Sequence, residues 1–228
     1  MVKAMKKRKK KTFESTAERH QQLREALLRA AERTIEAEGY QALRARALAE
    51  EVGCAVGAIY TVFPDLDALA LAVKSRIIDV LDAALAQAVA NAAGQGASAE
   101  QAAIRRLLAL AQAYLRFAVE QAARWRMLFE YRVAPGNTLP DWYVERLDAV
   151  FTHVDEPLHV LVPGLADDRR AELGRGLFSA VHGIVVLGLE QKLYTFSPET
   201  IAAQVETIMR ATIAGLMLRE RREEIIRV

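Results

Sequence analysis

Hydrophobic residues recur every three or four positions along most of the chain, which is the period of an amphipathic α-helix. Ser15 and Glu18 have the spacing of a helix capping box, and the apolar positions after them predict a first helix over residues 16–38, ended by Gly39. Alanine, leucine, glutamate and arginine are abundant, and alternating β-branched runs are few. The pattern therefore predicts an all-α protein.

Two short helices are expected next, over residues 44–52 and 55–61. Gly53 lies between them and can adopt the positive φ that a tight turn requires. Ala49 is small enough for two helices to cross closely, and Ile59 falls where the second short helix must face inward. This spacing of a small residue, a glycine and an apolar residue is typical of a helix-turn-helix that reads DNA.

The remainder of the chain predicts longer helices. Pro64 disfavours helical geometry at Phe63, and Asp65 can cap the helix that follows. That helix should run over residues 66–91 and extend about 35 to 40 Å at 1.5 Å per residue. Further helices are expected over residues 98–122, 124–132, 141–161, 167–192 and from Ser197 onward.

The last two predicted helices combine glycines with apolar residues. Each interior glycine costs about 1 kcal/mol of helix propensity relative to alanine, so several glycines indicate a packing benefit such as close helix approach. The glycines of the first of these helices include Gly174, Gly176, Gly183 and Gly188; the second has an apolar stripe of Ile201, Val205, Ile208, Thr212 and Leu216. We expect a homodimer to form through these two helices.

Composition limits the class of protein. The chain has 228 residues, 52% of them apolar, and a mean hydropathy of +0.05, so it can bury a core. The single cysteine, Cys54, excludes an internal disulfide framework, and no apolar stretch follows the basic start, so we expect a cytoplasmic protein. The apolar run Leu177–Leu189 is interrupted by Ser179 and His182 and is too short to span a bilayer, so we predict no membrane segment.

Charge is distributed unevenly. The net charge is +2, but residues 1–13 carry seven lysines and arginines and no acid, so the remainder sums to −5. Such a segment cannot pack and should be a mobile arm. It is either a solubilising tail or an arm that contacts phosphate through Lys9, Lys10 and Lys11.

Motifs for catalysis are missing from the sequence. There is no G-x-S-x-G elbow, no pair of Glu-x-x-His motifs on facing helices and no phosphate loop, so we expect neither catalytic residues nor a cofactor. The histidines lack metal-ligand spacing, which predicts no metal site: His20, His153, His159 and His182. His182 stands on an apolar helix and must find a hydrogen-bond partner, as a structural residue, in a pocket or at a dimer seam.

Aromatic residues are concentrated in the middle of the chain. Aromatic-lined cavities between helices often bind small apolar molecules, although the same enrichment is expected of ordinary core. The predicted ligand-binding residues are Tyr114, Trp125, Met127, Phe129, Trp142, Tyr143, Phe151 and His182.

The motifs over residues 39–69 resemble those of the TetR family of bacterial transcriptional regulators. The resemblance rests on A-E-E-V-G, the G-A-I-Y that follows, Phe63 and Leu69. It implies nine helices, with a variable C-terminal regulatory domain. The segment F-S-A-V-H-G-I-V-V-L-G-L, from Phe178 to Leu189, resembles the Trp-His-Gly type of that domain, with Phe178 in place of the tryptophan.

The resemblance also implies how DNA is bound. The third helix would enter the major groove. The family usually has phosphate-contacting polar residues where Arg44, Ala55, Val62 and Leu66 stand, and residues 12–70 hold six basic against ten acidic residues, so the basic arm would offset repulsion from DNA. The predicted DNA-binding residues are Arg44, Arg46, Ala55, Val56, Gly57, Ala58, Tyr60 and Thr61, with Lys9, Lys10 and Lys11 of the arm.

Together these features predict a repressor that a small-molecule effector releases from a pseudo-palindromic DNA operator. We expect a basic arm over residues 1–14, a DNA-binding domain over 15–65, and a ligand-binding and dimerisation domain over 66–228. Two alternatives remain: a non-specific nucleic-acid or membrane-surface protein that uses the lysine-rich arm, and a helical small-molecule enzyme. Specific operator binding would keep its sequence preference without the arm.

Overall fold

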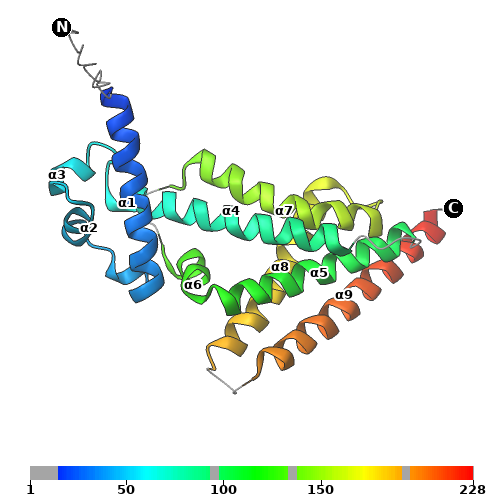
Figure 1. The fold of residues 1–228 in the computed structure, drawn as a ribbon. Coiled ribbons are helices and arrows are strands. Elements are labelled where there is room, and N and C mark those ends of the chain that lie inside the picture. Colours follow the sequence, from blue (N-terminus) through cyan, green and yellow to red (C-terminus); the bar gives the residue numbers. More distant parts are fainter. Residues whose placement is uncertain (1–14, 93–97, 133–137, 192–195, 228) are drawn as a thin grey trace, which may run out of the picture. The chain divides into compact units, whose positions relative to one another are not determined.

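The computed structural model describes residues 15–92, 98–132, 138–191 and 196–227. Within these ranges the chain forms nine α-helices and one short 3₁₀-helix, and no strand (Figure 1). The predicted all-α, nine-helix architecture is confirmed. The predicted basic arm, with Lys9, Lys10 and Lys11, lies outside the described residues.

The chain divides into two compact units, which we call the N-terminal unit (Met1–Ala70) and the C-terminal unit (Leu71–Val228). The division falls inside helix α4 (Leu66–Ala92), close to its first turn. Asp65 caps this helix, because its Oδ1 accepts a hydrogen bond from the backbone N–H of Ala68 at 2.7 Å. The cap was predicted from the sequence.

The N-terminal unit contains α1 (Thr16–Glu38), the 3₁₀-helix η1 (Tyr40–Ala42), α2 (Ala45–Val52) and α3 (Val56–Ile59). The predicted capping box of α1 is confirmed. Ser15 Oγ accepts from the Glu18 N–H at 3.2 Å, and Glu18 Oε2 accepts from the Ser15 N–H at 2.6 Å. The largest fully buried side chains of this unit include Leu27, Ile35, Leu48, Ile59 and Phe63.

Helix α3 is shorter than the predicted range 55–61. It ends at Ile59, and the next residues continue as tight turns in which the N–H of Thr61 bonds to Ala58 O at 3.2 Å and the N–H of Val62 bonds to Ile59 O at 3.1 Å. These bonds join residues three apart, and a last bond from the Phe63 N–H to Ile59 O at 2.9 Å closes the segment before Pro64, whose ring disfavours helical geometry at the preceding residue.

The C-terminal unit contains the rest of α4 and five further helices, close to the predicted ranges: α5 (Ala99–Glu120), α6 (Ala122–Glu130), α7 (Asp141–Leu161), α8 (Asp167–Leu189) and α9 (Pro198–Arg227). Helix α5 is central, because it packs against α6, α7, α8 and α9 (Figure 1). Helix α8 also packs against α7 and α9. The apolar stripe predicted for α9 is buried at Ile201 and Val205.

The predicted close helix approach occurs where α8 meets α9. A Cβ atom placed on Gly188 would lie 2.7 Å from both Cγ1 and Cδ1 of Ile201, which is fully buried in the first turn of α9. By contrast, a Cβ on Gly176 or Gly183 would meet nothing within 4 Å in the single chain. The glycines of α8 therefore have at least two different environments.

Two buried cations of the C-terminal unit differ in their partners. Arg170 donates through Nε and Nη2 to the Asp155 carboxylate, at 2.7 and 3.1 Å, and also pairs with Asp167 at 3.0 Å. Lys74 is only 7% exposed, yet its Nζ has one hydrogen bond, to the backbone oxygen of Tyr131 at 3.3 Å, and no carboxylate among the described residues lies within 4 Å. Burial lowers the pKa of Lys74 to about 8.

The contact at Gly188 predicts the effect of a single methyl group. Gly188→Ala should destabilise the protein by about 1 to 2 kcal/mol, because overpacking against Ile201 exceeds the gain in helix propensity. Gly174→Ala is the control in the same helix, since its Cβ would meet Val154 at 3.5 Å, an ordinary contact. Urea unfolding measures both; a Gly188→Ala variant at least as stable as the wild type would contradict the prediction.

The unpaired Lys74 predicts a pH-dependent stability. Because its folded-state pKa of about 8 lies below the unfolded value of 10.5, the folded protein binds fewer protons between these values and gains stability as pH rises through them. At pH 7, Lys74→Met should therefore raise the free energy of unfolding by about 1 to 3 kcal/mol, and this advantage should shrink near pH 10.

Urea unfolding of Lys74→Met at both pH values checks this expectation. Arg116→Met, which removes an exposed cation from α5, is the control and should change stability by less than about 0.5 kcal/mol at either pH. Loss of stability in Lys74→Met at pH 7 would mean that the ammonium is well compensated where it lies.

Candidate functional site

The turn between α2 and α3 has the geometry that the sequence predicts. Gly53 adopts φ 76° and ψ 37°, in the left-handed region, and its N–H bonds to the backbone oxygens of Ala49 and Glu50. The N–H of Cys54 bonds to Ala49 O at 2.9 Å. These bonds end α2 and begin the turn toward α3, and any residue other than glycine would be strained at this position.

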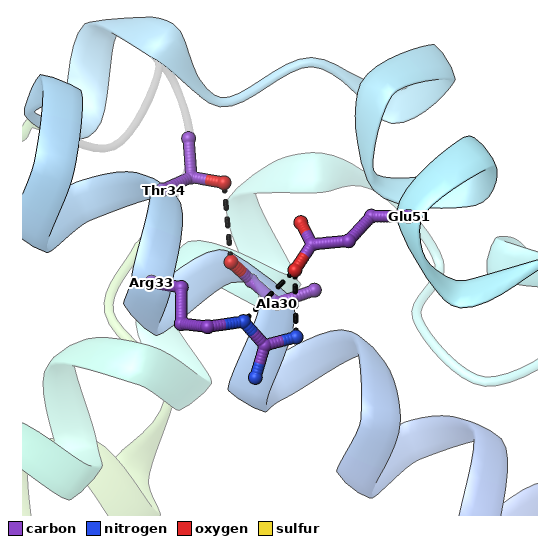
Figure 2. A network of polar contacts seen from close by, with 4 residues as sticks. All are labelled: Ala30, Arg33, Thr34 and Glu51. Atoms are coloured by element: carbon purple, nitrogen blue, oxygen red, sulfur yellow. Dashed lines mark hydrogen bonds and ion pairs between the residues drawn. The ribbon is translucent and has the colours of Figure 1, made fainter.

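Packing behind the turn holds α3 in place. Ala49 and Ile59 are buried, as predicted, and the guanidinium carbon of Arg24 on α1 lies 4.4 Å from the ring centroid of Phe63. Figure 2 shows a second link, in which Arg33 of α1 donates to Glu51 of α2 through Nε at 2.9 Å and Nη2 at 2.6 Å. Both side chains of this pair are partly exposed, so it contributes at most about 1 kcal/mol and mainly orients the two helices.

The same close-up contains a hydrogen bond within α1, from Thr34 Oγ1 to Ala30 O at 3.1 Å (Figure 2). Thr34 belonged to the predicted inward face of this helix and is half-buried. Its hydroxyl is satisfied by the preceding turn, so it can face the protein without leaving an unpaired polar group. The contact is structural.

The residues predicted to read DNA lie together on the outside of α3. Ala55, Val56 and Gly57 are exposed, and so are Tyr60 and Thr61 just after the helix. Ala58 is half-buried. The Thr61 hydroxyl donates to Ala58 O at 2.7 Å, so this face consists mainly of apolar atoms and the Tyr60 hydroxyl.

The two predicted arginines are exposed at the start of α2. Arg44 precedes the helix, and its Nη1 donates to the backbone oxygens of Gln41 at 2.6 Å and Leu43 at 2.8 Å. Arg46 is exposed in the first turn. Arg44 thus stiffens the preceding loop, a local role that the sequence pattern did not indicate.

A second candidate site is an apolar cavity of about 160 Å³ in the C-terminal unit. Apolar cavities of this size admit a molecule as large as benzene. It is lined by Ile78, Leu81, Leu85, Leu107, Leu110, Ala111, Tyr114, Leu128, Phe129, Tyr143, Leu147, Val150, Phe151, Val154, Leu177, Phe178, Val181 and Met209. Helices α4 to α9 all contribute to this wall.

The cavity brings together only part of the predicted ligand-binding set. Tyr114, Phe129, Tyr143 and Phe151 line it. Trp125 and His182 stand behind Tyr114, while Met127 is fully buried outside the lining and Trp142 is 47% exposed. Trp142 and Tyr143 are neighbours on α7, so they point about 100° apart, and only Tyr143 turns inward.

The Tyr114 hydroxyl joins Trp125 and His182 in a hydrogen-bonded group. The Trp125 Nε1–H donates to Tyr114 Oη at 2.7 Å, and Tyr114 Oη lies 2.6 Å from His182 Nδ1. Burial raises the pKa of Tyr114 and lowers the pKa of His182, so both groups are neutral at pH 7. His182 also stacks on Phe178, with ring centroids 5.6 Å apart. His182 thus has the hydrogen-bond partner that its place on an apolar helix requires.

Tyr143 differs from Tyr114. It is 3% exposed and lines the cavity, but its hydroxyl has no hydrogen-bond partner among the described residues. Burial raises its pKa to about 12, so the hydroxyl keeps its proton at neutral pH and can donate it to an acceptor. An unpaired hydroxyl in an apolar wall is a natural point of contact for a polar group of a ligand.

Sequence reasoning missed Lys74 and the aliphatic part of the cavity wall. Lys74 lies 5.8 Å from the ring centroids of both Tyr131 and Tyr143. A usable signal was present, because Lys74 interrupts the helical stripe formed by Leu71, Ile78, Leu81 and Leu85. Aliphatic lining residues carry no such signal, since they have the same pattern as ordinary core.

Within the described ranges, no group of three or more histidine, cysteine, aspartate or glutamate side chains is arranged to hold a metal ion. The short contact between Arg146 and Ser75 and the 2.9 Å pair of His153 with Asp82 join α7 to α4 instead. These polar contacts are accounted for by helix packing.

Two family models match the chain. Residues 27–73 match the model of bacterial regulatory proteins of the tetR family, and residues 107–212 match a tetracyclin repressor-like C-terminal domain. Together they cover about two thirds of the chain. No curated protein is significantly similar to the chain in sequence.

Solved structures share the fold over most of their length. A protein of unknown function from Rhodococcus sp. RHA1 has 26% identity and a TM-score of 0.65, covering 89% of this chain and 98% of its own. A Pseudomonas aeruginosa PAO1 protein described as a transcriptional regulator has 20% identity and a TM-score of 0.60, covering 87% and 94%. A Shewanella sp. PV-4 protein assigned to the TetR family has 15% identity and a TM-score of 0.58, covering 84% and 95%.

The family models match the two candidate sites. The tetR model spans the left-handed turn and the exposed face of α3, and the repressor-like model spans most of the cavity wall. The fold shared with the solved structures extends this agreement over the chain. The chain is a DNA-binding transcriptional regulator and belongs to the TetR family.

Proposed function

We propose that this regulator is a homodimeric repressor of a pseudo-palindromic operator and that a small molecule in the cavity of the C-terminal unit releases it. The observation that carries this proposal is the exposed face of α3, held outward by the Gly53 turn and the buried Ile59. In the dimer, two copies of α3 would enter successive major grooves roughly 34 Å apart. The protein would act in the cytoplasm.

The chemistry of α3 supports a particular kind of readout. Val56, Gly57 and Ala58 have no polar side-chain atoms, and the Thr61 hydroxyl already donates to the backbone. Base discrimination would therefore rest on thymine methyl groups, close backbone approach and DNA shape. Tyr60 and Arg46 are exposed and would contact phosphate or sugar, which positions the protein without reading sequence.

Helices α8 and α9 support self-association. Both are long and apolar enough, by length and composition alone, to cross a membrane, and only 28% and 22% of the residues in their apolar windows are buried. Helix α8 is long enough because it begins at Asp167, ten residues before the apolar run Leu177–Leu189, which is too short by itself. Small and apolar residues are exposed at helical spacing: Gly176, Ala180 and Leu187 on α8, and Ile208, Ala211, Gly215 and Leu218 on α9.

We assign these faces to a seam between protomers rather than to a membrane. Exposed charges on the same helices, such as Arg175 and Arg210, oppose insertion into a bilayer. A seam of four helices, two from each protomer, would cover the apolar residues and leave the charges at its edge. Gly176, with open space where a Cβ would lie, would allow close approach of the partner.

Release by an effector would use α4. Ile78, Leu81 and Leu85 of this helix line the cavity, whereas its first turn belongs to the N-terminal unit. A ligand that binds the DNA-free conformation better by about 3 to 4 kcal/mol would weaken operator affinity about 100-fold to 1,000-fold. The proposed domains are the arm over 1–14, the DNA-binding domain over 15–65 and the regulatory domain over 66–228.

Sequence-specific DNA binding is tested by mapping the genomic fragments that the purified protein retains. We expect a shared pseudo-palindrome in these fragments. Arg46→Ala should weaken binding to all of them by a similar factor, about tenfold, and reduce the salt dependence by about one phosphate contact, because Arg46 would not read bases. Arg116→Ala, which removes an exposed arginine of α5, is the control and should leave binding unchanged.

A variant without residues 1–14 separates this proposal from the lysine-arm alternative. Its affinity should fall while its preference for the shared fragments persists. Two results would contradict operator recognition. One is retention of DNA fragments regardless of their sequence; the other is arm-dependent binding to anionic vesicles by a protein that does not prefer any DNA sequence.

The seam is tested at Leu187, which is 47% exposed in the single chain. Leu187→Glu should convert the dimer to a folded monomer and weaken operator binding at least about 100-fold, since each protomer would hold only one half-site. Sedimentation velocity measures the oligomeric state. Leu139→Glu, at another exposed leucine, should remain dimeric; a dimeric Leu187→Glu variant would place the seam elsewhere.

A further inference from the structure

Lys74 is a buried cation whose surroundings do not neutralise it. Among the described residues, its single hydrogen bond leaves two of its three N–H donors without an acceptor, and no carboxylate lies within 4 Å. Arg170, the other nearly fully buried cation among the described residues of this unit, is paired with the Asp155 carboxylate. A buried charge without a counter-ion lowers the stability of the folded protein. An anionic ligand that binds Lys74 would remove this cost.

The position of Lys74 connects it to the cavity. Lys74 and Ile78 are one helical turn apart on the same face of α4, and Ile78, Leu81 and Leu85 continue that face along the cavity wall. Tyr143 links the two environments, because its ring lines the cavity and its centroid lies 5.8 Å from Lys74 Nζ. The Tyr143 hydroxyl also has no hydrogen-bond partner in the described part of the chain.

We propose that the effector is a small amphipathic carboxylic acid, whose carboxylate binds Lys74 and the Tyr143 hydroxyl and whose apolar body fills the cavity between α4 and α8. This inference rests on the proposed effector site and names the chemical class of its ligand. A carboxylate carries one negative charge and two acceptor oxygens, which match one ammonium and one phenolic hydroxyl.

The rest of the cavity favours this class over more polar ligands. Apart from Tyr114 and Tyr143, the lining side chains are aliphatic or aromatic hydrocarbons or methionine, and the Tyr114 hydroxyl is already bound by Trp125 and His182. A sugar or a nucleotide would bury hydroxyl or phosphate groups without partners. A volume of about 160 Å³ suits an aliphatic or aromatic body of roughly six to ten carbon atoms.

The competing explanation is that Lys74 is a structural residue whose ammonium is satisfied by the Tyr131 carbonyl and by the faces of two tyrosine rings. On that explanation, the charge of a ligand would have no influence on its binding. Comparing a carboxylate with the alcohol of the same carbon skeleton therefore separates the two explanations.

The experiment uses the full-length protein and two matched pairs of probes, octanoate with octan-1-ol and 3-phenylpropanoate with 3-phenylpropan-1-ol. Isothermal titration calorimetry at pH 7 measures affinity for the wild type, Lys74→Met and Tyr143→Phe. Methionine keeps the length of the lysine side chain without its charge, and phenylalanine removes only the hydroxyl. Arg116→Met, which changes the net charge equally at an exposed site, is the control.

We expect at least one acid to bind the wild type about tenfold or more tightly than its alcohol, the scale of one charge-assisted contact. Lys74→Met should lose this preference while its affinity for the alcohol stays within about threefold, which also shows that the cavity remains folded. Tyr143→Phe should lose part of the preference for the acid, and Arg116→Met should keep all of it. Equal binding of acid and alcohol, an unchanged preference in Lys74→Met, or no binding of either acid at millimolar concentration overturns the inference.

Operator release is measured separately, with the fragments retained in the mapping experiment. Carboxylate-selective binding that depends on Lys74, with no effect on DNA retention, would support the ligand class and count against effector control of the repressor. Specific operator binding without any preference for carboxylates would support operator recognition and contradict the proposed ligand class. The two proposals therefore fail in distinguishable ways.

Discussion

Gly53 holds its backbone at φ 76° and ψ 37°, and the exposed face of α3 depends on that conformation. The turn allows Ile59 to enter the small core beside Leu48, which leaves Val56, Gly57 and Tyr60 on the surface. A side chain at Gly53 would strain the turn and shift α3 relative to α2. In the proposed mode of DNA recognition, α3 must be presented in a defined orientation, and that orientation depends on Gly53.

The C-terminal unit balances packing against function in a different way. Where α8 meets α9, Gly188 permits contact so close that Ile201 leaves no space for a methyl group. Around Tyr143, by contrast, the described residues leave a cavity, a Tyr143 hydroxyl without an acceptor and a Lys74 ammonium without a carboxylate. Selection for stability alone would favour larger side chains that fill the cavity and acceptors that neutralise the polar groups beside it. The coexistence of tight and incomplete packing in one unit is expected of a domain that binds a small molecule.

Helical periodicity predicted most elements because it depends on local sequence alone. The capping box at Ser15 and Glu18, the cap at Asp65 and the helix beginning at Pro198 follow from hydrogen-bonding rules that act within four residues. The third helix was predicted too long, because its end depends on turn geometry near Pro64 that the periodic pattern does not express. The exposed face of α3, which we propose reads DNA, followed from the same local rules.

The cavity could be predicted only in part. Aromatic enrichment pointed to Tyr114, Phe129, Tyr143 and Phe151, but it could not separate them from Trp142, whose neighbour on α7 takes the inward position. The cavity wall is built from six helices, so its lining depends on contacts between segments distant in sequence. The hydrogen-bonded group around Tyr114 has the same origin, because Tyr114 lies 11 residues from Trp125 and 68 residues from His182 in the sequence.

The amino-acid sequence by itself determined the helical class, the left-handed turn at Gly53 and the resemblance to a family of regulators, because these depend on local conformation and on motifs of adjacent residues. Only the tertiary structure decided which aromatic side chains line a cavity, which glycine permits close helix contact, and that Lys74 is buried with no carboxylate within 4 Å among the residues that the structure describes. The reason is physical: burial and pairing are properties of groups brought together from different helices, and no local pattern specifies them.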